Sequence, residues 1–391
     1  MTKAVIFVAQ MYPCGLIRHL AYLGIELYRI FNGTNIAFFL ASIYDESHEE
    51  DWKLIRQQIP NTSLLQGATF EQVVEGMAAL LDRYDRVLIH CGGGYSQIKR
   101  IRLLKKKYGK RLSLVVTTHS YQHDSWRRPL MAYFQSWLYR LYVDHVVFQC
   151  PYAMRRFVGH GWFVRHAKAS VIPLGVETFY NETVDNDSAQ QGWAADLADG
   201  QTFKFVYLAQ FRKGKNHLWL VQILMDILKQ YPHARLFFVG GGGNDIQRQL
   251  STYISRNGLD RQVILTGQIP RQDVPWVLRH CDCALVPSQA ETFGHCFLEP
   301  MMAGIPVIGT RVGVAEYAIQ DFGTGLGFTP GSVEGMIQAV RYVLRHPSEA
   351  KKMGELASRM VSMLFTHRQV AETHRRLYCH ILEEGSSHEG L

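Results

Sequence analysis

The stretch VPSQAETFGHCFLEPMMAGIPVI, from Val286 to Ile308, places two glutamates, Glu291 and Glu299, eight positions apart around a predicted turn. The apolar run that ends at Val286 predicts a strand, and the pattern after Gly294 predicts a short helix that the glycine and proline of AGIP bring to an end. The stretch therefore predicts a strand, a loop, a helix and a second strand, the unit of a parallel α/β sheet.

The two glutamates lie where such a sheet binds its ligand. In an open α/β sheet the ligand crevice lies outside the carboxyl ends of the strands. Free amides at the helix start, near Gly294 to Phe297, would point at an anionic group. Glu291 on the loop and Glu299 on the helix can accept hydrogen bonds from hydroxyls at two ends of an elongated ligand. A phosphate between two hydroxyl-bearing ends describes a nucleotide sugar.

This window resembles the glutamate, seven residues, glutamate signature of retaining glycosyltransferases of family four. Five other segments resemble the same family and follow its order: VIPLGVETF (171–179), FVYLAQFRKGKNH (205–217), FVGGGG (238–243), VILTGQIP (263–270) and GVAE (313–316). The resemblance covers the C-terminal half almost continuously and the N-terminal half weakly. It implies an α/β chain of GT-B fold, with two Rossmann-like, doubly wound parallel-sheet domains facing across a cleft.

The resemblance also implies roles for individual residues. Glu299 would bind the ribose hydroxyls, and Glu291 the hydroxyls of the donor sugar. Lys215 and His119 join Glu291 as candidate catalytic residues; His119 follows a predicted strand and reads equally well as an ordinary loop histidine. The candidate donor-binding residues are Gly15, Arg212, Lys215, Gly267, Phe293, Gly294, His295, Cys296, Phe297 and Glu299.

Two positions depart from the family pattern. The family usually has an arginine five residues before the phosphate-binding lysine, where this chain has Gln210, so Arg212 is expected to supply the missing guanidinium. Pro300 stands inside the predicted helix where alanine is usual, and an interior proline removes a backbone hydrogen bond and kinks a helix. The kink would displace Glu299 slightly from the family position.

Length and alternation predict the domains. A chain of 391 residues exceeds one ordinary domain, and strand, loop and helix units repeat along it, including a helix over Leu16–Phe31 and strands over Arg86–His90 and Leu112–His119. We expect an N-terminal, acceptor-side domain over 1–178 and a polar linker or variable edge over 179–202. The next domain, over 203–365, is expected to bind the nucleotide sugar. The last helix, over 366–391, is expected to pack back on the first domain.

Composition narrows the kind of protein. The seven cysteines are odd in number and without paired CxxC motifs, so reduced thiols are expected rather than a disulfide frame or a zinc site. We expect no metal, and no cofactor beyond the nucleotide-sugar substrate. No apolar run is long enough to span a membrane, and the first residues lack a signal-peptide pattern, which predicts a cytoplasmic location.

Positive charge is concentrated in the first half. Residues 1–180 hold 22 Lys and Arg against 13 Asp and Glu, a net charge of +9, and Lys99 to Arg111 holds eight basic residues and no acid. A solvated helix face explains any one of these charges, whereas the half as a whole favours contact with an anionic membrane surface. Nucleic acid is not expected, because no nucleic-acid motif is present. The aromatic, basic segment Trp126 to Tyr142 carries one apolar stripe, which more often packs in a core than at a headgroup boundary.

The sequence thus predicts a metal-independent, retaining hexosyltransferase. It would move a sugar from a nucleotide-diphosphate donor to a glycan or lipid-linked acceptor in the assembly of a bacterial surface polysaccharide, at the inner face of the cell membrane. Two alternatives stay open: a sugar-nucleotide epimerase of the same architecture, and a non-catalytic nucleotide-sugar-binding protein. The nucleotide base, the acceptor and the linkage are not readable from the sequence.

Overall fold

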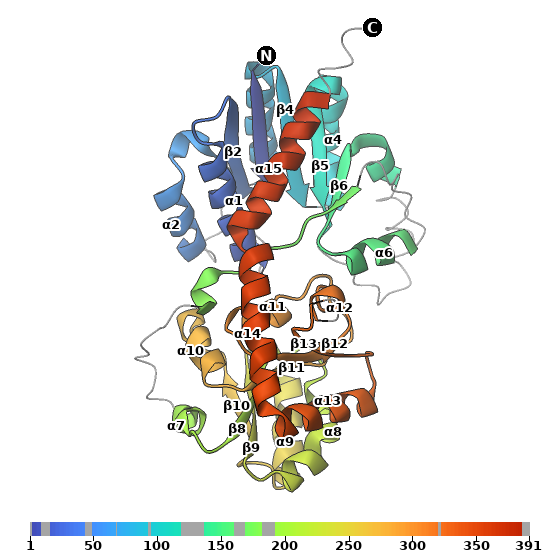
Figure 1. The fold of residues 1–391 in the computed structure, drawn as a ribbon. Helices are drawn as coiled ribbons and strands as arrows, with labels where there is room; N and C mark the ends of the chain where they lie inside the picture. The colour runs from blue at the N-terminus through green and yellow to red at the C-terminus, as the bar shows by residue number, and fades with distance from the viewer. Residues whose placement is uncertain are drawn as a thin grey trace. The chain divides into compact units, whose positions relative to one another are not determined.

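The chain folds into two compact units, which are described separately (Figure 1). The computed structural model describes residues 2–8, 16–43, 49–67, 69–92, 95–118, 137–159, 169–181, 192–319 and 322–384. The first unit comprises Met1–Gly175 and His367–Leu391, and the second comprises Val176–Thr366. The last helix of the chain therefore belongs to the first unit.

The first unit holds a parallel sheet of seven strands in the order β3-β2-β1-β4-β5-β6-β7. Its strands are β1 (Lys3–Val8), β2 (Ile36–Ile43), β3 (Leu64–Gly67), β4 (Arg86–Gly92), β5 (Leu112–Thr117), β6 (His145–Phe148) and β7 (Ala169–Val171). Its helices are α1 (Leu16–Phe31), α2 (Glu49–Gln58), α3 (Phe70–Arg83), α4 (Tyr95–Tyr108), α6 (Pro151–Gly159) and α15 (His367–Glu384), with 3-10 turns η2 (Asn61–Ser63) and η3 (Gly109–Arg111). Residues 137–142 are also helical.

Helices cover both faces of this sheet, which explains the continuously apolar central strands. Successive residues of β1 point to opposite faces of the sheet, so the neighbours Val5 and Ile6 belong to two different core clusters. One cluster includes side chains of α3 and α4, and the other includes side chains of α1, α2 and α15. Helix α15 lies against α1, although more than 330 residues separate them in the chain (Figure 1).

The second unit holds a six-stranded sheet, also parallel, in the order β10-β9-β8-β11-β12-β13. Its strands are β8 (Phe203–Leu208), β9 (Ala234–Val239), β10 (Val263–Gly267), β11 (Cys283–Val286), β12 (Val307–Thr310) and β13 (Gly325–Phe328). Its helices are α7 (Gly192–Ala198), α8 (His217–Gln230), α9 (Asn244–Arg256), α10 (Val274–Arg279), α11 (His295–Met302), α12 (Ala315–Ala318), α13 (Val333–Arg345) and α14 (Pro347–Leu364), with 3-10 turns η5 (Thr178–Asn181) and η6 (Arg271–Asp273).

The strand order of this second sheet reverses at β8 and β11. Sequence-consecutive strands run outward from β8 to β9 and β10 on one side, and from β11 to β12 and β13 on the other. At such a switch point the loops after the two central strands diverge to opposite faces and leave a crevice at the carboxyl edge. The loops after β8 and β11 contain Lys215 and Glu291, respectively.

The predicted fold class, two doubly wound parallel-sheet domains, is confirmed. The helix expected over Leu16–Phe31 has those bounds, and the strand expected over Arg86–His90 continues to Gly92. Within the segment expected to be a linker or edge, α7 buries Ala194 and Leu197 in the second unit.

Two helices stand at the C-terminal end of the chain. Helix α15 starts at His367, next to the start of the helix expected over 366–391, and Phe365 and Thr366 separate it from α14. The amide of Val176 donates to the carbonyl of Phe365 at 2.7 Å, and Thr366 forms a parallel bridge with Val176. An extended backbone at this point is incompatible with a continuous helix.

Candidate functional site

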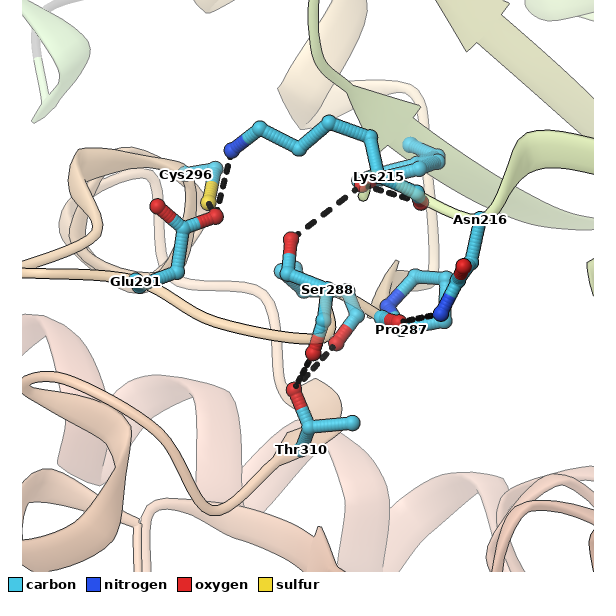
Figure 2. Close-up of polar contacts among 9 residues, drawn as sticks. Lys215, Asn216, Pro287, Ser288, Glu291, Cys296 and Thr310 are labelled. Carbon is cyan, nitrogen blue, oxygen red and sulfur yellow. Dashed lines mark hydrogen bonds and ion pairs between the residues drawn. The ribbon is translucent and has the colours of Figure 1, made fainter. Parts of the chain in front are cut away.

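The loop after β8 has a fixed backbone that directs Lys215 toward the loop after β11. Asn216 adopts a left-handed conformation, with φ of 59°, and asparagine tolerates this conformation better than most residues. Its side-chain Nδ2 donates to the carbonyl of Pro287 at 2.9 Å (Figure 2). The hydroxyl of Tyr207 donates to the Lys215 carbonyl at 2.8 Å. These bonds fix the lysine backbone on both sides.

The loop after β11 is held equally closely. The amide of Gln289 donates to the carbonyl of Gly214 at 2.9 Å, which joins the two loops directly. The hydroxyl of Thr310 donates to the carbonyl of the fully buried Ser288 at 2.7 Å (Figure 2). The two loops therefore form one hydrogen-bonded platform at the switch point.

Lys215 and Glu291 form an ion pair on this platform (Figure 2). Both side chains are mostly buried, with 24% of Lys215 and 14% of Glu291 exposed. Burial by itself lowers the pKa of Lys215, but nearby negative charge, including that of Glu291, outweighs burial and raises this pKa above its usual value. The pair thus holds a permanent positive charge beside a hydrogen-bond acceptor.

Helix α11 begins beside this ion pair. Its N-cap, Gly294, has φ of 98°, and a Cβ there would lie 2.8 Å from the ring of Phe297. The first amides of a helix have no partner within it, and the amides of His295 and Cys296 stand at this end of α11. The thiol of Cys296 donates to Glu291 at 3.6 Å, and burial raises its pKa, so the sulfur is uncharged at neutral pH.

Phe297 differs from the prediction for the donor site. Its amide donates to the carbonyl of Gly294 at 3.1 Å, and its side chain is fully buried. The residue belongs to the core beneath the helix, and its amide is already hydrogen-bonded.

Glu299 lies one turn further along α11 within a second polar cluster. The hydroxyl of Tyr180 hydrogen-bonds to its carboxylate. Burial raises the pKa of Glu299 to about 7, although the charge of Arg271 opposes the rise. Arg271 in turn forms an ion pair with Glu177, with 3.2 Å between Nε and Oε2, and its guanidinium lies 5.9 Å from the ring centroid of Tyr180.

The sequence motifs do not indicate these three neighbours of Glu299. Glu177 lies in the segment VIPLGVETF and Arg271 directly follows VILTGQIP, so both adjoin segments that the family resemblance singles out. Glu177 and Arg271 are 94 positions apart, so no local sequence pattern predicts that they pair. The opposite charges of these two residues, each in or next to a motif segment, were the only sequence feature that suggested the pair.

A turn at Gly313 packs against the loop that contains Glu291. The amide of Val314 donates to the carbonyl of Phe293 at 2.7 Å. Gly313, with φ of 59°, approaches so closely that a Cβ would lie 2.2 Å from the Phe293 carbonyl oxygen. The segment GVAE therefore supports the loop mechanically.

Pro300 lies inside α11, as expected. It is buried, and the helix continues for two residues beyond it. Its position places a residue without an amide donor directly after Glu299.

The remaining predicted residues divide into three groups. Arg212 is exposed in the same loop as Lys215, and its charge lowers the pKa of Lys215. Gly267 ends β10 with φ of 72°, and its carbonyl accepts from the amide of Gly240 at 3.0 Å. Gly15 and His119 lie outside the described residues.

His90, at the end of the strand expected over Arg86–His90, is a core residue of the first unit. Its Nδ1 is hydrogen-bonded to the Tyr378 hydroxyl, and its Nε2 lies 2.6 Å from the Thr117 hydroxyl. The first contact joins β4 to α15, and the second joins β4 to β5 within the sheet.

Metal and membrane signatures are absent from the described part of the chain. No three His, Cys, Asp or Glu side chains there are grouped so as to hold a metal ion. No described helix is both long and apolar enough to cross a bilayer.

Two family models match the chain. The model "Glycosyl transferases group 1" matches residues 194–360, and the model "Glycosyl transferase 4-like domain" matches residues 14–175. The chain belongs to the group 1 glycosyltransferases. The first model contains Lys215, Glu291 and Glu299, so the platform at the switch point lies inside the family domain.

Curated relatives of this glycosyltransferase align over part of its length. The D-rhamnosyltransferase WbpZ of Pseudomonas aeruginosa is 31% identical over 169 residues, which are 42% of this chain and 41% of that protein. The N-acetyl-alpha-D-glucosaminyl L-malate synthase of Bacillus anthracis is 27% identical over 179 residues, 46% of each chain. The chain thus spans less than half the length of each of these relatives.

Solved structures share the fold over nearly the whole chain. Alr3699/HepE of Anabaena, in complex with UDP, has a TM-score of 0.75 at 18% identity, covering 96% of this chain and 99% of that one. A glycosyltransferase of Rickettsia africae has a TM-score of 0.76 at 16% identity, covering 98% and 99%. At these identities the likeness shows the GT-B fold alone.

Proposed function

We propose that this glycosyltransferase moves a hexose-type sugar, with retention and without a metal ion, from a nucleotide-diphosphate donor to a hydroxyl group. The ion pair of Lys215 with Glu291 beside the start of α11 carries the proposal. It sets a cation and a carboxylate beside a helix start, which matches a diphosphate joined to a sugar.

The diphosphate would lie over the amides of His295 and Cys296. Lys215 and Arg212 would neutralise the charge that develops on it as the sugar leaves. A lysine and a helix start supply positive charge in place of a metal ion. Glu299, further along the helix, would accept the ribose hydroxyls.

Donor binding would rearrange the ion pair. In the free protein the charge of Lys215 is turned to Glu291. A diphosphate competes for that ammonium, and the released carboxylate can then accept hydroxyls of the donor sugar. No protein nucleophile is required if the acceptor attacks from the face that the diphosphate leaves, since the departing oxygen can take the acceptor proton.

The acceptor is proposed to be a glycan or a lipid-linked saccharide in bacterial surface polysaccharide assembly, at the inner face of the cell membrane. The net charge of +9 in residues 1–180 supports an anionic surface as a partner. WbpZ, a D-rhamnosyltransferase by name, supports a transferase of bacterial glycan building.

The Lys215→Ala variant tests the site, with Lys213→Ala as its matched control. Lys213 is an exposed lysine of the same loop without an ion pair among the described residues. Thermal stabilisation across nucleotide diphosphates and their sugars first identifies the donor, beginning with UDP and UDP-glucose because HepE structures contain them. We expect Lys215→Ala to lower kcat/KM for transfer by roughly 100-fold and Lys213→Ala to change it by less than about twofold.

Three outcomes would overturn the proposal. Equal rates for both variants would remove Lys215 from the site. Isomerised donor in the absence of any acceptor would identify an epimerase. Donor binding without turnover across an acceptor panel would identify a binding protein.

A further inference from the structure

A second surface of the first unit is built from α4 and the helical residues 137–142. Both segments cover the same face of the sheet, because Ile101 and Leu104 of α4 share a core cluster with Leu138 and Tyr139. They also touch at their edges. The ammonium of Lys106 lies 5.9 Å from the ring centroid of Tyr142. Their outer surfaces therefore adjoin.

Large apolar side chains are exposed on these outer surfaces. Leu103 is 60% exposed, Trp137 50% and Leu141 51%. The apolar stripe predicted for the segment ending at Tyr142 was more readily interpreted as core, and for two of its members this was wrong. Leu138 is buried, whereas Trp137 and Leu141 face outward. A single exposed leucine needs no explanation. Three large apolar side chains on two adjoining helices form a patch whose exposure to water is unfavourable in free energy.

Basic side chains surround these apolar groups. Nearby acids are already engaged: Glu71 pairs with Arg100 at 2.6 Å, and Asp144 pairs with Lys105 at 2.6 Å. Five other basic residues of this surface form no ion pair with an acid among the residues that the structure describes: Lys99, Arg102, Lys106, Lys110 and Arg140. The charge of Asp82 acts on Lys107, and Arg111 of η3 donates to backbone carbonyls. The surface therefore carries positive charge that the protein leaves unneutralised.

We propose that this surface, formed by α4, Lys110 and residues 137–142, docks on an anionic lipid bilayer. Lysine and arginine can place their charges at phosphate groups while their alkyl chains lie along apolar surface. Tryptophan and leucine between them match the boundary between headgroups and acyl chains. Docking through this surface would bring the protein to the membrane that carries the proposed acceptor, and this role rests on the proposed function.

Vesicle co-sedimentation of the full-length protein, without donor or acceptor, tests the docking face. The vesicles contain phosphatidylcholine alone or with about one third phosphatidylglycerol. We expect binding only to the anionic vesicles, weakening as salt rises. Replacing Lys99, Arg102 and Lys106 by Ala should weaken binding on the order of 100-fold, since each charge contributes about fivefold.

Two further variants separate charge from insertion and from net charge. Trp137→Ser with Leu141→Ser should weaken binding at least tenfold while every basic residue remains. Replacing Lys229, Arg256 and Lys351 by Ala removes three exposed charges from the second unit and should leave binding within about twofold. Arg102 is half-buried and the other substituted side chains are exposed, so each variant should keep a melting temperature close to that of the wild type.

The outcomes are distinct from those of the transfer assay. No binding of wild-type protein to anionic vesicles would overturn the docking face, whatever the donor assays give. An equal loss of vesicle binding in the second-unit control would show that only the net charge of the protein matters. That result would also overturn the docking face. Failure of donor turnover with vesicle binding intact would overturn the proposed function and leave the docking face standing.

Discussion

At the residue scale, Glu299 is a carboxyl group whose pKa is far from its ordinary value. Its pKa is raised by burial from 4.5 to about 7, so the native protein holds this proton more tightly than the unfolded chain. The stabilisation from the bound proton is complete below pH 4.5 and is lost as the pH rises through about 7. The side chain of the Glu299→Gln variant cannot ionise, so the variant should not lose this stability as the pH rises.

We therefore expect Glu299→Gln to gain stability relative to wild type between pH 5 and pH 8. The gain in the free energy of unfolding should be about 2–3 kcal/mol, measured by urea denaturation without nucleotide. Glu355→Gln removes an exposed carboxylate of the same unit and should show no such gain. An identical difference between wild type and Glu299→Gln at both pH values would mean that burial does not perturb this carboxyl.

The sequence identified Lys215, Glu291 and Glu299 singly, because each stands at a fixed place in a motif. It did not pair Lys215 with Glu291, which are 76 positions apart. Nor did it place Tyr180, Arg271 and Glu177 around Glu299. Such contacts depend on how strands order themselves in the sheet, and the order β8-β11 is a tertiary property. Motifs give residue types, whereas topology decides which of them meet.

At the element scale, the turn before α12 positions the loop that contains Glu291. We expect Gly313→Ala to destabilise the second unit by at least about 3 kcal/mol, because its Cβ would lie 2.2 Å from the Phe293 carbonyl oxygen in addition to the strain of positive φ. Gly258→Ala is the matched control. Its φ of 67° is similar, but a Cβ there meets nothing within 4 Å, so a cost of only about 1 kcal/mol is expected.

Donor binding should follow the same order. Gly313→Ala should weaken nucleotide-diphosphate affinity, measured by calorimetry, because the displaced Phe293 carbonyl moves the loop of Glu291. Gly258→Ala should leave that affinity unchanged. Equal losses of stability in the two variants would show that backbone strain, and not the contact with the loop, sets the cost.

Element boundaries show where local pattern stops being sufficient. Helix α1 has its predicted bounds because an apolar stripe and a flanking turn specify both ends. The break between α14 and α15 lies beside the start of the C-terminal helix expected over 366–391, although no local turn signal near Phe365 marks it. That break is imposed by Val176, nearly 190 residues earlier, through one hydrogen bond and one bridge.

At the scale of the whole molecule, the last helix completes the first unit. Tyr378 and Leu382 of α15 are fully buried in the core cluster that contains α1 and α2. Neither belongs to the second unit, from which the chain has just emerged. The first unit therefore lacks part of its core until the end of the chain has been added.

Leu382→Ala should accordingly weaken the first unit alone. We expect a loss of about 2–5 kcal/mol, since the side chain is fully buried. Hydrogen exchange should show faster exchange across α1 and β1, with β8 and β11 of the second unit unchanged. The neighbouring Glu383→Ala alters an exposed position and should change neither unit. Faster exchange in both units after Leu382→Ala would mean that they unfold together, and α15 would then stabilise the entire chain rather than one sheet.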